Sequence, residues 1–205
     1  MHIPAKPTTA IADIAFDAAL QSALREQEAY DVSRWLYVPP VYTDYRYILG
    51  TRGENPLICI GINPSTAAPD ALDNTLKSVE RIALHNGFDS FIMLNVYAQR
   101  ATDPNDMERE RNAAMHRENL AAFAYALSLS GNAPSVWAAW GTIVEKRPYL
   151  IGCMRDFFTA SQGRSVRWLS AGALSKKGHP HHPLYLKKDT PLDAFDMAAY
   201  CGSFS

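Results

Sequence analysis

Residues 57–66, which read Leu-Ile-Cys-Ile-Gly-Ile-Asn-Pro-Ser-Thr, constrain the fold of this chain more than any other segment. A continuous apolar run that ends in turn residues is typical of a strand buried on both faces, as in a parallel sheet. Gly61 allows another group to approach the backbone closely, and Pro64 cannot continue a strand ladder. The segment therefore predicts a buried strand that delivers Asn63 and Ser65 to its carboxyl end, where open α/β sheets bind ligands. An ordinary strand–turn junction is the simpler alternative.

Apolar strands and amphipathic helices alternate through the rest of the sequence. Strands are predicted at 57–61, 90–97, 135–141 and 166–170, and helices at 11–25, 67–87, 109–129 and 143–159. Such alternation predicts one α/β domain with a central four-stranded parallel sheet flanked by helices. Residues 1–45 are predicted to be an N-terminal arm, a helix and an aromatic, proline-rich segment (irregular or a short hairpin) packed on the core of the 46–205 domain.

Chain length, net charge and cysteine content limit the number of domains, the kinds of partner and the cellular compartment that we expect. A chain of 205 residues suits one domain, and its net charge of −1 provides no overall basic field for nucleic acid. The three cysteines lack metal-binding spacing, and Cys59 lies inside the apolar strand, which favours free thiols and a reducing compartment. No apolar run is long enough to span a membrane, and the N-terminus lacks a signal pattern. We expect a cytoplasmic protein without a membrane partner.

Polar residues follow the predicted strands at the points where the strands end. Because the carboxyl ends of parallel strands lie along one edge of a sheet, these residues can line one crevice. A stiff loop with three histidines, whose imidazoles can donate or accept near neutral pH, follows the last strand. The candidate site residues are Gly61, Ile62, Asn63, Pro64, Ser65, Thr66, Asn95, Tyr97, Arg100, Gly141, His179, His181 and His182.

Simpler roles remain open for several of these residues. Asn95 could satisfy backbone groups at a strand end, and Arg100 could form a local ion pair with Asp103. The histidine loop could be a surface turn or, because His-x-His-His resembles ligand spacing, part of a metal site, although no Asp, Glu or Cys lies close in sequence. The dinucleotide, P-loop and α/β-hydrolase motifs are absent. The sequence therefore predicts no cofactor and no resident metal.

Five segments together carry a resemblance at two levels. They are residues 61–67, 73–75, 95–104, 138–141 and 178–185. From about Arg46 to Leu186 the chain resembles a bacterial and phage family known only as a domain of unknown function. More distantly, the same segments in the same order resemble the uracil-DNA glycosylase superfamily, and residues 61–64 are similar to the first motif of its mismatch-specific branch. That resemblance implies a central four-stranded parallel sheet flanked by helices.

The distant resemblance also implies a chemistry. Asn63 would position a water molecule for attack on an N-glycosidic bond, and His179 would stabilise the departing base. Asn95 would read the base, so that the expected partner is a nucleotide, a nucleobase or DNA. A non-catalytic module that binds a nucleotide or nucleic acid through the same crevice is the alternative. A metal-dependent hydrolase built on the histidine loop is a third hypothesis.

Overall fold

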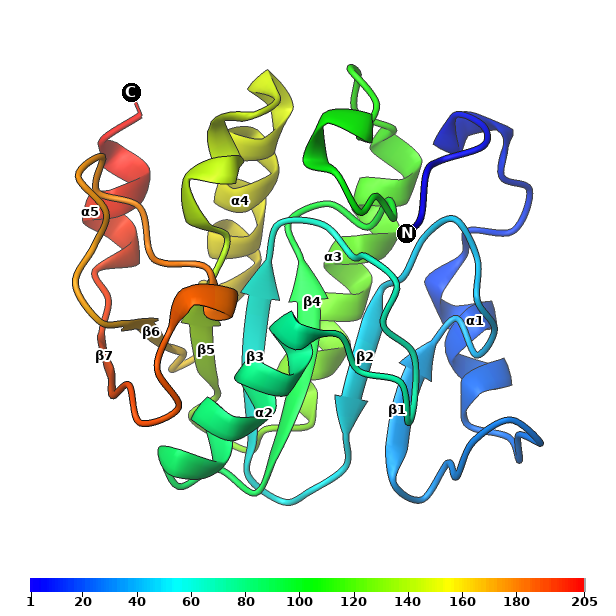
Figure 1. Cartoon of the computed structure of the whole chain (residues 1–205), viewed down its shortest axis with the longest axis horizontal. Helices are drawn as coiled ribbons and strands as arrows, with labels where there is room; N and C mark the ends of the chain where they lie inside the picture. The colour runs from blue at the N-terminus through cyan, green and yellow to red at the C-terminus, as the bar shows by residue number, and fades with distance from the viewer. Residues whose placement is uncertain (205) are drawn as a thin grey trace.

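A seven-stranded mixed sheet forms the centre of the protein (Figure 1). The computed structural model describes residues 1–204, apart from the side chain of Tyr185. Its strands are β1 (Trp35–Val38), β2 (Ile48–Thr51), β3 (Pro56–Gly61), β4 (Ser90–Asn95), β5 (Ser135–Ala138), β6 (Arg167–Ala171) and β7 (Leu192–Ala194), in the order β1-β2-β4-β3-β5-β6-β7. The helices are α1 (Phe16–Ala23), α2 (Asn74–His85), α3 (Ala113–Ser128), α4 (Pro148–Ser161) and α5 (Met197–Gly202). The chain is thus a single α/β domain.

The sheet is larger than the four-stranded parallel sheet predicted from the sequence. Strands β4, β3, β5 and β6 run parallel to one another, but β1 and β2 add an antiparallel hairpin at one edge and β7 an antiparallel strand at the other. These added strands have only three or four residues each, too few for a periodic signal. The aromatic segment 30–45 therefore contributes β1 to the sheet itself.

Both faces of the sheet are buried, which explains the unbroken apolar strands. In β3, Ile58 and Ile60 pack into the core cluster that contains residues of α1, α3, α4 and α5. Leu57 and Cys59 point to the opposite face and pack against α2. Figure 1 shows α2 on the near side of the sheet, in front of β3 and β4. Because helices cover both sides of the sheet, apolar side chains project from both faces of β3 and from both faces of the middle of β4.

The helices begin later than the sequence pattern predicts. The segment predicted as a helix from residue 67 becomes helical only at Asn74, because the carboxylate of Asp73 accepts a hydrogen bond from the amide of Leu76 at 2.9 Å and caps the helix there. Helix α1 likewise begins at Phe16 rather than near residue 11. No helix within residues 1–204 is long and apolar enough to cross a membrane.

Candidate functional site

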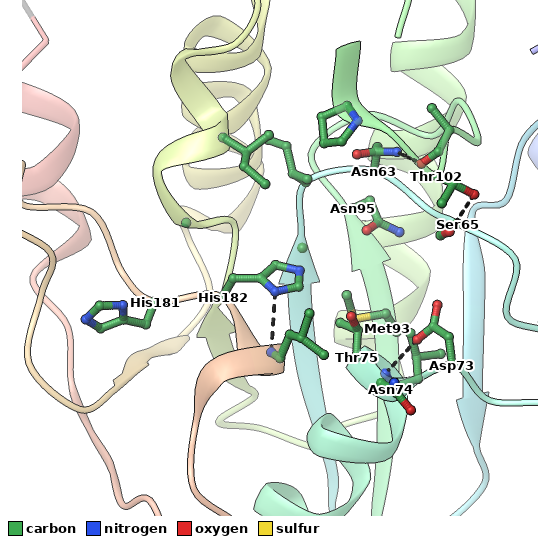
Figure 2. A pocket seen from close by; sticks show the side chains of 18 of the residues that line it. Asn63, Ser65, Asp73, Asn74, Thr75, Met93, Asn95, Thr102, His181 and His182 are labelled. Carbon is green, nitrogen blue, oxygen red and sulfur yellow. Dashed lines mark hydrogen bonds between the residues drawn. The ribbon is translucent and has the colours of Figure 1, made fainter. Parts of the chain in front are cut away.

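A crevice of about 730 Å³ lies at the carboxyl ends of β3, β4 and β5 (Figure 2). A volume in this range is typical of sites for small organic ligands. Its wall includes the loop after β3, the ends of β4 and β5, the first residues of α2 and the histidine loop. Of the candidate residues, the crevice is lined by Gly61, Ile62, Asn63, Ser65, Thr66, Asn95, Gly141, His181 and His182.

Asn95, the last residue of β4, is buried in this wall with an unsatisfied amide group. Its side chain is 1% exposed, and its Nδ2 atom has no hydrogen-bond partner within residues 1–204. Gly61 is its neighbour across the β3–β4 pair, and a Cβ at Gly61 would lie only 2.9 Å from the Asn95 Oδ1 atom. Glycine therefore leaves room for this amide. A buried amide that lacks a partner is rare, and a ligand is one way to satisfy it.

The loop after β3 is held by hydrogen bonds to its backbone. Asn63 donates from Nδ2 to the carbonyl oxygen of Ala101 at 2.7 Å, which ties this loop to the loop after β4. Arg100 is completely buried and donates to the carbonyl oxygens of Ser65 and Ala67. Arg100 does not line the crevice and does not pair with Asp103, so its role is to brace the loop.

Within the histidine loop, His182 is the residue that enters the crevice. Figure 2 shows its ring directed toward the side of Asn95, whereas the exposed ring of His181 points the other way. The Nδ1 atom of His182 accepts a hydrogen bond from the amide of Leu184 at 3.4 Å, which places the proton of the neutral ring on Nε2. Burial lowers the pKa of His182 below its ordinary value, although the charge of Asp73 opposes this shift. His182 is therefore a neutral donor at pH 7.

His179 lies beneath the loop and does not line the crevice. Its ring is completely buried and stacks on Phe204, with 5.7 Å between the ring centroids. The Nδ1 atom lies 2.7 Å from the hydroxyl of Tyr200, and Nε2 lies 3.0 Å from a carboxylate oxygen of Glu145. Both ring nitrogens are thus engaged. In this arrangement His179 anchors the loop that carries His182 instead of facing a ligand.

Gly141 lies against His182, and its replacement by alanine should affect both the backbone at position 141 and the neighbouring histidine. Its φ of 63° is left-handed, and a Cβ there would lie 3.3 Å from the Cβ of His182. Gly131 has a φ of 66° but open space around it. We expect Gly141→Ala and Gly131→Ala each to lower the free energy of unfolding by about 1–2 kcal/mol. Only Gly141→Ala should also shift the NMR resonances of the His182 ring; equal shifts in both variants would contradict this contact.

The sequence did not single out Arg46 or the residues at the start of α2 as site residues. Arg46 is 1% exposed, lines the crevice, and donates from Nη1 to the carbonyl oxygen of Ala67 at 3.1 Å. Asp73, Asn74 and Thr75 line the same wall. Burial, and secondarily the charge of Arg100, lower the pKa of Arg46 to about 9. A charged residue just before an apolar strand resembles a surface residue, so nothing in the sequence indicates this burial.

Besides Arg100 and His179, two more candidate residues from the sequence do not line the crevice. Tyr97 is completely buried, and its hydroxyl donates to Glu108 and accepts from the amide of Asn112. Pro64 is buried in the loop next to the wall, and its carbonyl oxygen accepts from the amide of Ala101 at 2.9 Å. Within residues 1–204, no group of three or more His, Cys, Asp or Glu side chains is arranged to hold a metal ion.

Comparisons with known proteins place the chain in one family. Residues 46–184 match the family described as "Protein of unknown function (DUF1643)", which covers most of the sheet and every segment that lines the crevice. No curated protein and no solved structure matches the chain at a significant level. The match to the family covers more than half of the chain, and the chain therefore belongs to the DUF1643 family of proteins of unknown function.

Proposed function

We propose that the crevice binds the base of a nucleoside or nucleotide and that the protein hydrolyses the N-glycosidic bond to that base. The observation that carries this proposal is the buried, unpartnered amide of Asn95 in the crevice wall. A side-chain amide offers one acceptor and two donors in one plane, which matches the polar edge of a nucleobase. Enzymes that act on bases recognise them through this edge in a closely fitting pocket.

The proposed reaction assigns one role to each of two further residues. The Oδ1 atom of Asn63 would orient a water molecule, whose oxygen forms the new bond to the anomeric carbon and whose proton passes to solvent. The electron pair of the broken bond leaves with the base, which takes up a proton from solvent. Nε2–H of His182 would donate to the base oxygen as negative charge develops there. His182 takes the role expected for His179, because His179 is engaged elsewhere.

Two further features of the crevice support a bound base. Tyr97 and Trp140 would close the crevice if they projected into it, but both are completely buried in the core. Trp140 is held there by a hydrogen bond of 2.9 Å from its Nε1 to the hydroxyl of Tyr200. A cavity of about 730 Å³ therefore stays open for a base and an attached sugar.

A binding module without catalysis is the second candidate function. It is favoured by the lack of a carboxylate beside Asn63: among the described residues that line the crevice, Asp73 is the acidic side chain, and one of its oxygens caps α2. An amide activates water less strongly than a carboxylate, because it cannot accept the proton. The two candidates predict the same ligand and differ only in turnover.

Release of free base tests the proposal. The substrates are nucleosides, nucleotides, and single- and double-stranded DNA that carry uracil, hypoxanthine, xanthine or mismatched bases. We expect wild type to release base from at least one substrate and Asn63→Ala to lower kcat by about 100-fold, the effect of removing one group that acts in the transition state. Asn95→Ala should instead raise KM, because it removes recognition of the base.

The exposed Asn132 provides the matched control, since Asn132→Ala makes the same change far from the crevice. Its kinetics should equal those of wild type. Binding of a base or nucleotide by folded wild type without any release of base would refute hydrolysis and establish the binding module. A kcat of Asn63→Ala within about twofold of wild type would refute the role given to Asn63.

A further inference from the structure

Two arginines lie buried side by side next to the crevice without a carboxylate in ion-pair contact. Arg46 and Arg100 are at most 1% exposed. Burial lowers the pKa of both guanidinium groups, and the charge of Arg100 lowers the pKa of Arg46 further. Their side chains donate hydrogen bonds to backbone carbonyl oxygens and to the hydroxyl of Tyr37. The Nε atoms of both have no partner within residues 1–204. Buried charges are ordinarily paired, and among the described residues no carboxylate lies in direct contact with either arginine.

The first turn of α2 brings additional donors to the same wall. Asp73 accepts from the amide of Leu76 through its side chain and from the amide of Lys77 through its carbonyl oxygen. No hydrogen bond within the described part of the chain uses the amides of Asn74 and Thr75, and both residues line the crevice. Open amides and the helix dipole together favour an anion at this end of a helix.

The local charge balance also favours an anion. Asp73 is the carboxylate whose charge acts on both Arg46 and Arg100, so the cluster holds two guanidinium groups against one carboxylate. Asp73 acts in the same way on His182, whose lowered pKa leaves it neutral at pH 7. A net positive charge therefore remains beside the crevice. In a low-dielectric setting, an anion seated there would be held more strongly than in water.

We infer that Arg46 and the amides of Asn74 and Thr75 form a subsite for the phosphate group of the substrate. Guanidinium groups and helix N-termini both recognise phosphate oxygens. Here both line one crevice, and the charge of Asp73, which caps α2, acts on Arg46. The inference rests on the proposed function for the rest of the substrate, a nucleoside. It makes that substrate a nucleotide, bound either as a free monophosphate or through a phosphate of an oligonucleotide.

Binding experiments test the subsite without requiring turnover. Isothermal titration of the full chain uses inorganic phosphate, a nucleoside, its 5′-monophosphate and a short single-stranded oligonucleotide. We expect the monophosphate or the oligonucleotide to bind at least about tenfold more tightly than the nucleoside, because hydrogen bonds to charged groups contribute more than neutral ones. If the monophosphate binds more tightly than the nucleoside, the phosphate belongs to a free nucleotide; if only the oligonucleotide does, the phosphate belongs to a nucleic acid strand.

Two variants test whether the tighter binding of phosphate depends on Arg46 and on the amides at the start of α2. Asn74→Pro removes one amide N–H at the first helical position, where proline is compatible with a helix and the preceding Asp73 is already extended. Ala113→Pro makes the same change at the first position of α3, away from the crevice, and is its control. Arg46→Met removes the guanidinium. Asn74→Pro and Arg46→Met should each reduce affinity for phosphate by about tenfold, and Ala113→Pro should leave it unchanged.

The outcomes separate this inference from the proposed function. Loss of phosphate affinity in Asn74→Pro supports the subsite even if Arg46→Met fails to fold and even if no base is released from any substrate. Wild type that binds neither phosphate nor a nucleotide more tightly than a nucleoside would overturn the subsite. Equal phosphate affinities for Asn74→Pro and Ala113→Pro would also overturn it, while base release from an unphosphorylated nucleoside would leave the proposed hydrolysis intact.

Discussion

Replacement of His182 by alanine should lower the kcat for base release by about 100-fold or more and change KM much less. The reason is that Nε2–H of His182 is expected to bind the base oxygen mainly when charge develops on it. The lowered pKa of the ring keeps this donor in its neutral form at pH 7. Steady-state kinetics with the best substrate from the panel, measured beside wild type, give the size of the effect.

Two neighbouring histidines control for this result. His181→Ala alters an exposed ring that points away from the crevice and should leave kcat within about twofold of wild type. His179→Ala should destabilise the loop through the lost contacts to Tyr200 and Glu145. If folded His179→Ala lost more activity than His182→Ala, the role in catalysis would belong to His179 and the assignment to His182 would be wrong.

The pH dependence of kcat tests the protonation state of His182. Protonation would remove the acceptor on Nδ1 and break the hydrogen bond from the amide of Leu184. The pKa of His182 in the folded protein lies below the ordinary histidine value of about 6.5. The active neutral form therefore persists at pH 7 and is lost only as the pH falls through that lower pKa. Because the pKa of His182 is lower in the folded than in the unfolded protein, the neutral ring favours folding. This contribution to the free energy of unfolding is complete above about pH 6.5 and is lost as the pH falls through the folded pKa.

The sequence was most informative where each local signal agreed with the tertiary structure. The apolar run 57–61 is β3, and the predicted strands at 90, 135 and 166 are β4, β5 and β6. The edges were predicted less completely: the sequence allowed a short hairpin within residues 30–45, where β1 lies, but did not predict β7. Short edge strands depend on pairing with their neighbours in the sheet as well as on their own pattern. The sequence therefore predicted the middle of the sheet better than its edges.

The candidate site was predicted in part, for a reason that follows from topology. Strand ends in a parallel sheet lie along one edge, so Gly61, Asn95 and Gly141 could be expected to meet, and all three line the crevice. The orientation of side chains within a loop has no such rule. Residues 179–182 place two histidines in different environments, one buried on Tyr200 and one in the crevice, because the prolines and Gly178 set the backbone there. The burial of Arg46 likewise depends on contacts distant in sequence.

Replacement of Arg100 by methionine should lower the free energy of unfolding by about 3 kcal/mol. Methionine retains much of the apolar volume but none of the donors. The carbonyl oxygen of Ser65 and the hydroxyl of Tyr37 would then lose a buried partner, and each such loss costs about 1–3 kcal/mol. The stacking of the guanidinium on Tyr42, 4.2 Å from the ring centroid, is lost as well. Urea denaturation of both proteins measures the difference.

Arg117→Met is the matched control, because its side chain is 73% exposed and its stability should change by no more than about 0.5 kcal/mol. A partial offset is expected in Arg100→Met, since the charge of Arg100 also destabilises the neighbouring charge of Arg46. That offset should appear as a rise in the pKa of Arg46. If Arg100→Met were as stable as Arg117→Met, the repulsion between Arg100 and Arg46 would cost as much free energy as the hydrogen bonds of Arg100 contribute. The loop that carries Asn63 would then be held by the hydrogen bond from Asn63 to Ala101. Arg100 would then contribute positive charge to the anion subsite at no net gain in stability.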